Sequence, residues 1–400
     1  MARESDVDTA PAMTAAPTLS EERGVRAPAS AAHETRPVGE RPTVCMINYN
    51  GEAYLERSLS ALTAQMSSLA EIVMVDNGST DGSRALVEAR FPHVRLVAMP
   101  RNLGAAAARN VAIAEARTDL ILLIDNDVTL ARGALHALHE ALRAHPDAVM
   151  AMPAILHGPA PDGATVQYDG AETHFLGQQT LHHQEEPYPT VPRATRAIGS
   201  LVSACLLLDR ARLPRGENGA TDALATFDED FFIYFEDHDF GHRMRALGLG
   251  VLAVPAAFCH HGAGTQGVSI RALGTYSSLR VYSHIRNRWI FLLKNYELRS
   301  LLLLAPVLAM YEAVQLAAVA KKGWLREWWR SAWWMATHAR AVHRKRRVIQ
   351  RHRRTPDREL LRGGPVPLRA EATVSAAERA ARRVLDASAG WYWRVVRRAL

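Results

Sequence analysis

Short apolar runs alternate with helical patterns over residues 42–125. The apolar runs cover residues 43–49, 71–76, 94–99 and 120–125. The segments between them have the apolar spacing of helices, at 52–65, 83–91 and 104–116. Strands that are apolar throughout and are separated by helices are typical of a parallel sheet with both faces covered. We therefore predict an α/β fold with a Rossmann-like, mostly parallel central sheet and helices on both faces.

The pattern becomes less regular after this sheet. The apolar run at 200–209 predicts a further strand, and a longer run at 300–320 has the length of a membrane span, since about 20 residues cross a bilayer. Pro306, Glu312 and Gln315 lie within this longer run and disfavour simple insertion. A helix that is half buried in the membrane interface, or that packs against a neighbouring helix, is an alternative to a span.

Composition and charge set the two ends of the chain apart. Residues 1–40 are rich in Ala and Pro and show no apolar periodicity, so we expect a disordered leader and no signal peptide. From Lys321 onward there are 21 Lys and Arg against 6 Asp and Glu, whereas the preceding 320 residues hold 27 against 35. Seven of the eight Trp also lie in this basic tail. Arg combined with Trp favours a membrane surface as partner, with nucleic acid as the disfavoured alternative.

Polar residues gather where the predicted strands end, and ligands of such sheets bind beyond the carboxyl ends of the strands. The second strand ends at Asp76 in VDNGSTDGS, where a carboxylate can bind a nucleobase or ribose. The fourth ends in IDND, where Asp125 and Asp127 can hold a divalent cation against a diphosphate. Between these motifs, Arg101 and Arg109 in PRNLGAAAARN either hold phosphate oxygens or balance the acids.

An acidic cluster, FEDHDFGHR, occupies residues 235–243. Asp239 and Arg243 are four residues apart, which predicts an ion pair along one helix. Acids in a first helical turn also interact favourably with the helix dipole. These arguments explain Asp239 and leave Asp237 without a structural role.

The motifs NYNG, VDNGSTDGS, PRNLGAAAARN and IDND, in this order and spacing, resemble family-2 glycosyltransferases of the GT-A fold. The later FIYFEDHDFGHRMRALGLG and VPAAFCHHGAGT are similar to the rhamnosyl- and galactofuranosyltransferase branch of that family. The resemblance covers residues 42–295. It implies an inverting transfer of a sugar, rhamnose-like or another hexose, from a nucleotide diphosphate donor to a hydroxyl of a lipid-linked or cell-envelope glycan.

The resemblance also implies a donor site and a metal site. The residues that it places on the donor side are Asn48, Asp76, Arg101, Arg109 and Asp125. It makes Asp127 a ligand of a divalent metal, Mn²⁺ or Mg²⁺. A histidine soon after the P-x-A segment completes the metal site in relatives, and counting from Pro255 favours His261 over His260.

For catalysis, the resemblance makes Asp237 the general base, with Glu236 beside it on the acceptor side. An attacking hydroxyl must lose its proton, and one carboxylate within hydrogen-bond reach can accept it. Single displacement inverts the anomeric centre without a covalent intermediate, so no second catalytic carboxylate is needed.

Together these patterns divide the chain into three parts. We expect the leader at 1–40, a glycosyltransferase domain at 41–295 with a donor half (41–130) and an acceptor half (131–295), and a helical, membrane-associated tail at 296–400. Three widely spaced cysteines in apolar runs indicate reduced thiols, and we expect a cytoplasmic enzyme, peripheral or monotopic at the inner face of the cell membrane. The alternatives are a nucleotidyltransferase and a non-catalytic protein that binds sugar nucleotides or nucleic acid.

Overall fold

The structure is a computed structural model, and it describes residues 41–157, 163–214, 223–262, 277–367 and 376–400. These residues belong to one compact unit. The leader expected at 1–40 lies outside the described residues. How the chain divides into donor half, acceptor half and tail stays a prediction.

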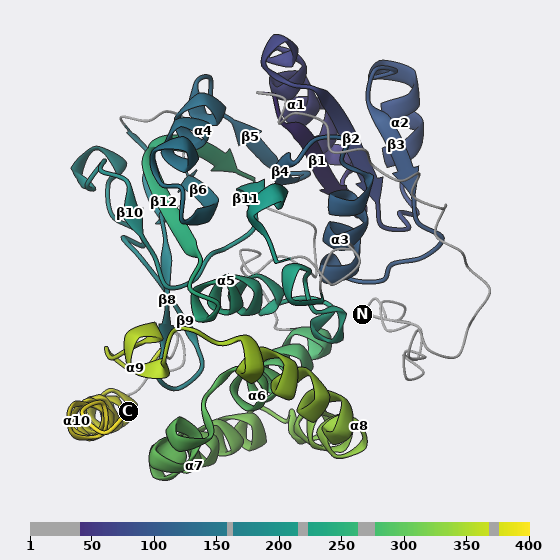
Figure 1. The fold of residues 1–400 in the computed structure, drawn as a ribbon. Helices are drawn as coiled ribbons and strands as arrows, with labels where there is room; N and C mark the ends of the chain where they lie inside the picture. The colour runs from purple at the N-terminus through teal and green to yellow at the C-terminus, as the bar shows by residue number, and fades with distance from the viewer. Residues whose placement is uncertain (1–40, 158–162, 215–222, 263–276, 368–375) are drawn as a thin grey trace. The chain divides into compact units, whose positions relative to one another are not determined.

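The described chain contains one large sheet, one small sheet and a set of helices (Figure 1). The strands are β1 (Thr43–Asn48), β2 (Glu71–Asp76), β3 (Arg95–Ala98), β4 (Leu120–Asp125), β5 (Val128–Leu130), β6 (Ala148–His157), β7 (Thr165–Tyr168), β8 (Ala171–His174), β9 (Gln179–Leu181), β10 (Arg196–Ala197), β11 (Cys205–Asp209), β12 (Gly250–His261) and β13 (Leu361–Arg362). The α-helices are α1 (Glu52–Thr63), α2 (Ser83–Arg90), α3 (Ala105–Glu115), α4 (Ala134–Ala144), α5 (Glu236–Ala246), α6 (Ser278–Asn295), α7 (Leu298–Lys321), α8 (Leu325–His352), α9 (Asp357–Leu360) and α10 (Ala376–Val396). The four strands and three helices predicted between residues 42 and 125 are all present.

The large sheet has the order β10-β12-β6-β11-β4-β1-β2-β3, with β5 added beside β12 and β7 beside β6. The predicted parallel part is β3-β2-β1-β4, and β6 is also parallel to β12. Between these two parts, β11 runs antiparallel to both β4 and β6. The mixed α/β sheet with C-terminal helices confirms the predicted fold class, and the sheet is parallel in β3-β2-β1-β4 and in the β6-β12 pair.

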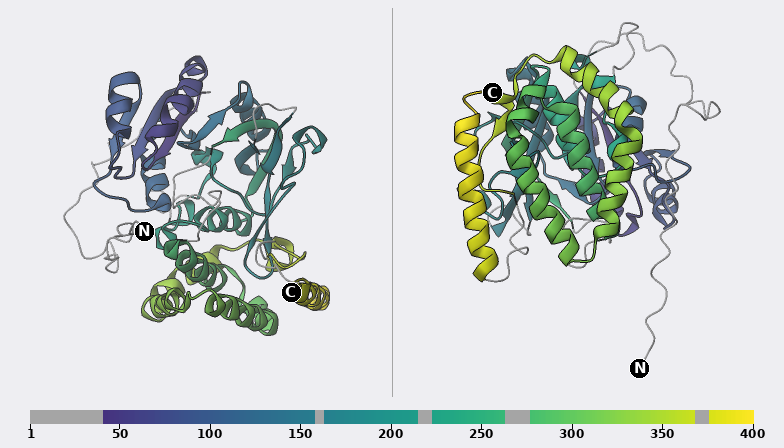
Figure 2. Two further views of the ribbon diagram at one scale, coloured as in Figure 1. Left: turned by 180° about the vertical axis from the view of Figure 1, so that it is seen from behind. Right: turned by 90° about the horizontal axis from the view of Figure 1, so that it is seen from below.

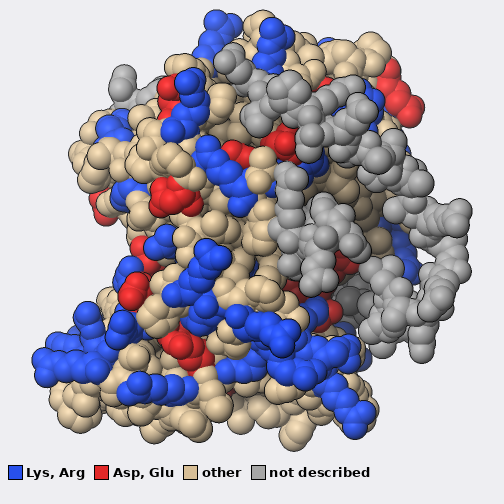
Figure 3. Space-filling model, in the orientation of Figure 1, with Lys and Arg blue, Asp and Glu red and all other residues tan. Residues whose placement is uncertain are grey.

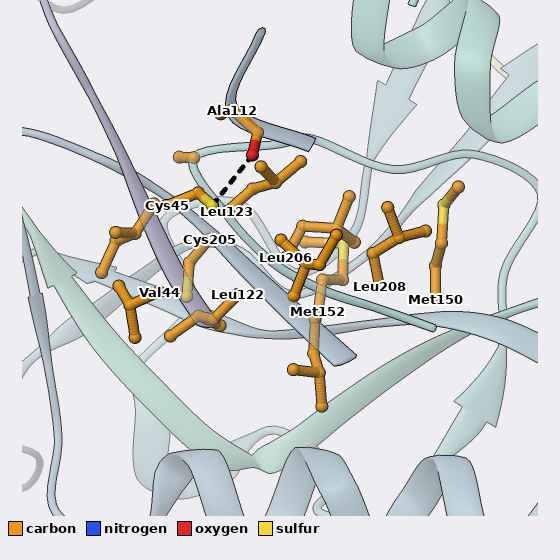
Figure 4. Packing of buried hydrophobic residues seen from close by; sticks show 14 of the residues in the cluster. Val44, Cys45, Ala112, Leu122, Leu123, Met150, Met152, Cys205, Leu206 and Leu208 are labelled. Carbon is orange, nitrogen blue, oxygen red and sulfur yellow. Dashed lines mark hydrogen bonds between the residues drawn. The ribbon is translucent and has the colours of Figure 1, made fainter. Parts of the chain in front are cut away.

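The central strands are buried on both faces, as their apolar composition predicts. Around Cys45 of β1, side chains from β4 and β11 fill the space, including Leu122, Leu123 and Cys205 (Figure 4). The Cys45 thiol donates to the carbonyl oxygen of Ala112 in α3 at 3.2 Å. Burial raises the pKa of this thiol well above its ordinary value, so the thiol stays protonated. The three cysteines are free and buried, as the sequence predicts.

The C-terminal helices α6, α7, α8 and α10 run side by side (Figure 2). Among the described residues, α7 is the one helix that is long and apolar enough to cross a bilayer, judged by length and composition. Its Glu312 forms an ion pair with Arg288 of α6, and its Tyr311 accepts a hydrogen bond from Gln178 at 3.1 Å. One face of α7 therefore packs on polar groups of the protein, as the alternative of a helix packed against a neighbour requires.

Candidate active site

The polar residues predicted at the strand ends lie at one edge of the sheet. The register of β1 pairs Asn48 with Asp76 of β2, and Ile47 with Asp125 of β4. Because these three strands are parallel, their carboxyl ends meet at the same edge. The loop after β4 carries Asp127 along the same edge.

Asp76 is held by hydrogen bonds from three sides. Its Oδ2 accepts from Nδ2 of Asn48 at 2.9 Å, and its Oδ1 accepts from the Ser79 amide at 3.0 Å and from Nε of Arg84 at 2.7 Å. Burial alone would raise the pKa of Asp76, but these hydrogen bonds hold it below its ordinary value, so the carboxylate is ionised at neutral pH. The sequence did not indicate that Arg84 contacts Asp76, because the position of Arg84 on α2 is typical of an ordinary surface residue of a helix.

Asn48, which contacts Asp76, also contacts the loop after β4 at close range. Asn126 donates from Nδ2 to Oδ1 of Asn48 at 2.7 Å. A Cβ atom at Gly51 would lie 1.8 Å from that Nδ2 and 2.4 Å from Oδ1 of Asn48. The NYNG motif therefore needs glycine at its last position so that this loop can pack against Asn126.

Arg109 joins two acids that are far apart in the sequence. From α3, its guanidinium contacts Oδ1 of Asp125 and Oε1 of Glu236, each at 2.9 Å. Arg109 and Glu236 are both buried, whereas Asp125 is partly exposed. These contacts bind the Arg109 guanidinium to acids of the protein, and its role on the donor side stays a prediction. Arg101, in contrast, is exposed in the loop that follows β3, and its role on the donor side stays a prediction.

Asp237 stands in the first turn of α5 and is half buried. Its Oδ2 accepts from the Ser203 amide at 3.3 Å, and its Oδ1 accepts from the His238 amide at 2.7 Å. Burial raises the pKa of Asp237 above its ordinary value, and Arg109 offsets part of that effect. A carboxylate with a raised pKa that is still partly exposed suits a proton acceptor.

Glu236, the neighbouring acid, is turned toward Arg109. Burial, and then the adjacent Asp237, raise the pKa of Glu236 from its ordinary value of 4.5 to about 8. The placement of Glu236 on the acceptor side stays a prediction.

The raised pKa of Glu236 should make the free energy of unfolding depend on pH. Between pH 4.5 and about 8 the folded protein keeps a proton on Glu236 that the unfolded chain releases, so the free energy of unfolding should fall as pH rises. Glu236→Gln should remove a slope of at most about 1.4 kcal/mol per pH unit. Urea unfolding of both proteins at several pH values in this window measures the difference. Parallel curves would contradict the assignment.

Of the two candidate metal histidines, strand pairing places His261 next to Asp127. His261 of β12 pairs with Val128 of β5, and its Nε2 lies 3.2 Å from Oδ1 of Asp127. Successive residues of a strand point to opposite faces, so His260 points away from this carboxylate. The Nδ1 atom of His261 lies 3.0 Å from Oε1 of Gln167, a residue that the sequence analysis did not identify. Such a contact fixes the orientation of a ligand imidazole.

The residue types of this pair fit a divalent metal that is shared with substrate. A carboxylate oxygen and an imidazole nitrogen are ligands of Mn²⁺, and Mg²⁺ sites commonly combine one or two carboxylates with substrate phosphates. Within the described ranges, no group of three or more His, Cys, Asp or Glu side chains forms a closed metal site. Asp127 and His261 could therefore hold a metal whose other ligands come from a diphosphate and water.

Comparison with known proteins adds evidence of a different kind. Residues 43–196 match the family described as Glycosyl transferase family 2. The N-acetylglucosaminyl-diphospho-decaprenol L-rhamnosyltransferase of Mycobacterium tuberculosis is 30% identical over 248 residues, which cover 56% of this chain and 77% of that protein.

Two solved structures are also similar. GalNAc-T7 with UDP, GalNAc and Mn²⁺ is 15% identical, with a TM-score of 0.48 and coverage of 65% of this chain and 48% of that one. The mannosyltransferase PcManGT from Pyrobaculum calidifontis, in complex with GDP-Man and Mn²⁺, is 18% identical, with a TM-score of 0.43 and coverage of 80% and 89%. Since the similarity to the rhamnosyltransferase extends over about three quarters of that protein and the family match includes all the strand-end motifs, this chain is a glycosyltransferase and belongs to glycosyl transferase family 2.

Proposed function

We propose that this glycosyltransferase inverts the anomeric centre while it transfers a sugar, rhamnose-like or another hexose, from a nucleotide diphosphate to a hydroxyl of a lipid-linked or cell-envelope glycan. One observation carries the proposal: the three consecutive residues 125–127 contact the nucleobase side, Arg109 beside the candidate base, and the candidate metal histidine. Asp125 contacts Arg109, Asn126 contacts Asn48, and Asp127 contacts His261. The name of the mycobacterial relative, a rhamnosyltransferase with a decaprenol-linked sugar in its title, supports the sugar and the acceptor class.

Each group has a separate task in this proposal. Asp76 and Asn48 bind the base or ribose of the donor, at the sheet edge where nucleotides bind in α/β folds. Asp237 accepts the proton of the attacking hydroxyl, which its raised pKa and partial exposure favour. Arg109 keeps Asp125 and Glu236 together, so that the acids on both sides of the reaction stay in place.

Asp127 and His261 are the proposed ligands of Mn²⁺ or Mg²⁺. When bound, such a cation stabilises the negative charge that develops on the departing diphosphate.

A panel of dTDP-, UDP- and GDP-linked hexoses tests the function. We expect one donor to raise the melting temperature of the full-length protein in the presence of Mn²⁺, because a ligand that prefers the folded state stabilises it. The same donor should glycosylate a prenyl-diphosphate-linked acceptor analogue, with inversion seen by NMR. Retention of the anomeric configuration would refute the mechanism. Transfer of the nucleotide instead would support the nucleotidyltransferase alternative, and binding without transfer would support a non-catalytic protein.

We further propose that the enzyme works at the inner face of the cell membrane, attached by its C-terminal helices. Among the described residues, all of the exposed large apolar side chains lie on α6, α7, α8 and α10: Leu293, Leu298, Leu302, Val314, Leu325, Trp329, Trp333, Val348, Val384, Trp391 and Val395. Lys and Arg form a band on the lower part of the face in Figure 3, just above uncharged surface. An apolar surface beside cations suits the anionic leaflet better than nucleic acid.

The proposed geometry is attachment in the plane of the interface. The polar side of α7 packs on the protein through Glu312 and Tyr311, whereas Leu298 and Leu302, one helical turn apart, are about two-thirds exposed. A helix with one protein-facing and one exposed apolar side fits an interfacial position and does not require a span.

Trp329 and Trp333 are the two most exposed indoles of α8. Replacing both should weaken binding to phosphatidylglycerol vesicles by at least about tenfold, because each substitution removes a large apolar contact with the membrane. Sedimentation of Trp329→Ala/Trp333→Ala with vesicles measures this. Binding should also weaken with salt and in phosphatidylcholine vesicles. Two double variants that each remove two positive charges test the role of charge. Arg344→Ala/Arg347→Ala, on α8, should reduce vesicle binding, whereas the control Arg57→Ala/Arg90→Ala, on α1 and α2, should not. Equal binding by all variants would exclude this surface.

A further inference from the structure

The segment 231–235, which leads into α5 and Asp237, has an unusual backbone. Phe232, Tyr234 and Phe235 have positive φ angles of 60°, 65° and 71°, although none of them is a glycine. Residues with a Cβ atom disfavour this region, so such a conformation persists only where surrounding contacts hold it. Strained backbone of this kind is concentrated at functional sites. The contacts that hold this segment are therefore of functional interest.

Asn287 of α6 makes most of these contacts. Its Nδ2 lies 2.9, 2.9 and 2.7 Å from the carbonyl oxygens of Phe231, Ile233 and Tyr234, so one of its two N–H bonds is shared between two of them. Asn287 is fully buried. One side-chain amide therefore serves three carbonyl groups of a single strained turn.

Arg286 fixes the orientation of that amide. Its Nε donates to Oδ1 of Asn287 at 2.9 Å, so the oxygen of the side-chain amide faces Arg286 and the NH₂ group faces the segment. The Nη2 atom of Arg286 donates to the carbonyl oxygens of Asp230 at 2.8 Å and Phe231 at 3.0 Å. Two adjacent residues of α6 thus bind four consecutive or nearly consecutive carbonyl groups before the candidate base.

The chain just before this segment is tied to the C-terminal helices by charge. Asp228 forms ion pairs of 2.5 Å with Lys294 of α6 and with Lys345 of α8. The buried ion pair at Asp228 holds the chain before the turn, and the amide of Asn287 holds the turn itself. The candidate base therefore depends on helices that lie outside the sheet.

We propose that Asn287 is a positioning residue for Asp237: its amide holds the segment 231–235 in the strained form that sets where α5 begins and where the base carboxylate stands. The inference rests on the proposed role of Asp237 as general base. Phe235 directly precedes α5, so a change of its φ to an ordinary value would redirect the first turn. Asn287 donates to carbonyl groups and accepts from Arg286, and it acts through Asp237.

Asn287→Ala in the full-length protein tests the proposal. We expect kcat to fall by about 10- to 100-fold, because a displacement of about 1 Å in a reacting group has an effect of that order. The affinity for the donor should stay unchanged, because the contacts of Asp76 do not involve α6. Hydrogen exchange of the amides in 231–237 should become faster.

Two further variants separate positioning from general stability. Asn295→Ala removes an equally buried amide from the same helix, one that donates to Asp239 at 2.7 Å, and should lower the melting temperature with little effect on kcat. Asn287→Ser has nearly the size of alanine but keeps a hydroxyl donor, so its kcat should lie between those of wild type and Asn287→Ala. It supplies the same comparison should the alanine variant not fold.

Equal losses of kcat in Asn287→Ala and Asn295→Ala, in proportion to their melting temperatures, would overturn the proposal. Unchanged hydrogen exchange in 231–237 of the Asn287 variants would overturn it too. A failure of the proposed function is visible separately, since Asp237→Asn would then retain full kcat while exchange still reports whether Asn287 holds the segment.

Discussion

Asp237→Asn should lower kcat by about 10²- to 10⁴-fold, the usual contribution of a positioned general base. The substitution keeps the shape of the side chain and one acceptor oxygen for the Ser203 amide, so the first turn of α5 should persist. The KM for the donor should change little, because the partners of Asp76 lie on β1, in the loop after β2 and on α2, and not on α5. Steady-state kinetics with a prenyl-linked acceptor measures both quantities.

A control and a pH profile sharpen this test. Asp147→Asn removes an exposed carboxylate just before β6, at the opposite edge of the sheet, and should leave kcat unchanged. Because burial raises the pKa of Asp237, the wild-type kcat/KM should decline on the acid side at a pH above the ordinary range of Asp. Full activity in Asp237→Asn would show that Asp237 is not the base. A decline of kcat/KM at the pH where an exposed carboxylate titrates would show the same.

Asp127→Asn should abolish the response to Mn²⁺. A metal ion contributes several kcal/mol to a transition state in which charge develops, so its loss corresponds to a decrease in kcat of at least about 100-fold. The donor should also lose the part of its thermal stabilisation that depends on Mn²⁺. Melting curves with donor, with and without Mn²⁺, give this readout independently of catalysis.

The adjacent histidines provide an internal comparison for the metal site. His261 lies 3.2 Å from Asp127, so His261→Gln should weaken the Mn²⁺ response more than His260→Gln does. Gln167→Leu should weaken the affinity for Mn²⁺ by about 10- to 100-fold, the usual effect of losing the partner that orients a ligand histidine. The reverse order of the two histidine variants would contradict the strand register on which the assignment depends.

Local spacing predicted a large part of the fold. The apolar runs of 43–49, 71–76 and 120–125 became buried strands, as continuous apolar runs do in a parallel sheet that is covered on both faces. Residues four apart on a helix are neighbours, and Arg243 does contact Asp239, at 2.7 Å. Strand ends were informative for the same reason, since parallel strands bring Asn48, Asp76 and Asp125 to one edge without further information.

Contacts between distant segments were not predictable in this way. The pairing of Arg109 with Glu236 joins residues 127 positions apart, and it depends on how α5 packs beside α3. Arg84, Gln167 and Asn287 carried no motif, because a lone polar residue on a helix or strand reads as exposed until its partner is known. Their roles follow from packing alone.

The sequence by itself determined the α/β class, the edge of the sheet at which chemistry is expected, and the family resemblance that the rhamnosyltransferase comparison confirms. Only the tertiary structure decided that β11 enters antiparallel, that His261 lies 3.2 Å from Asp127, and that α6 contacts the turn before Asp237. The physical reason is the range of the interactions. Side-chain periodicity is a property of neighbouring residues, whereas strand register and helix packing depend on the burial of surfaces contributed by the whole chain.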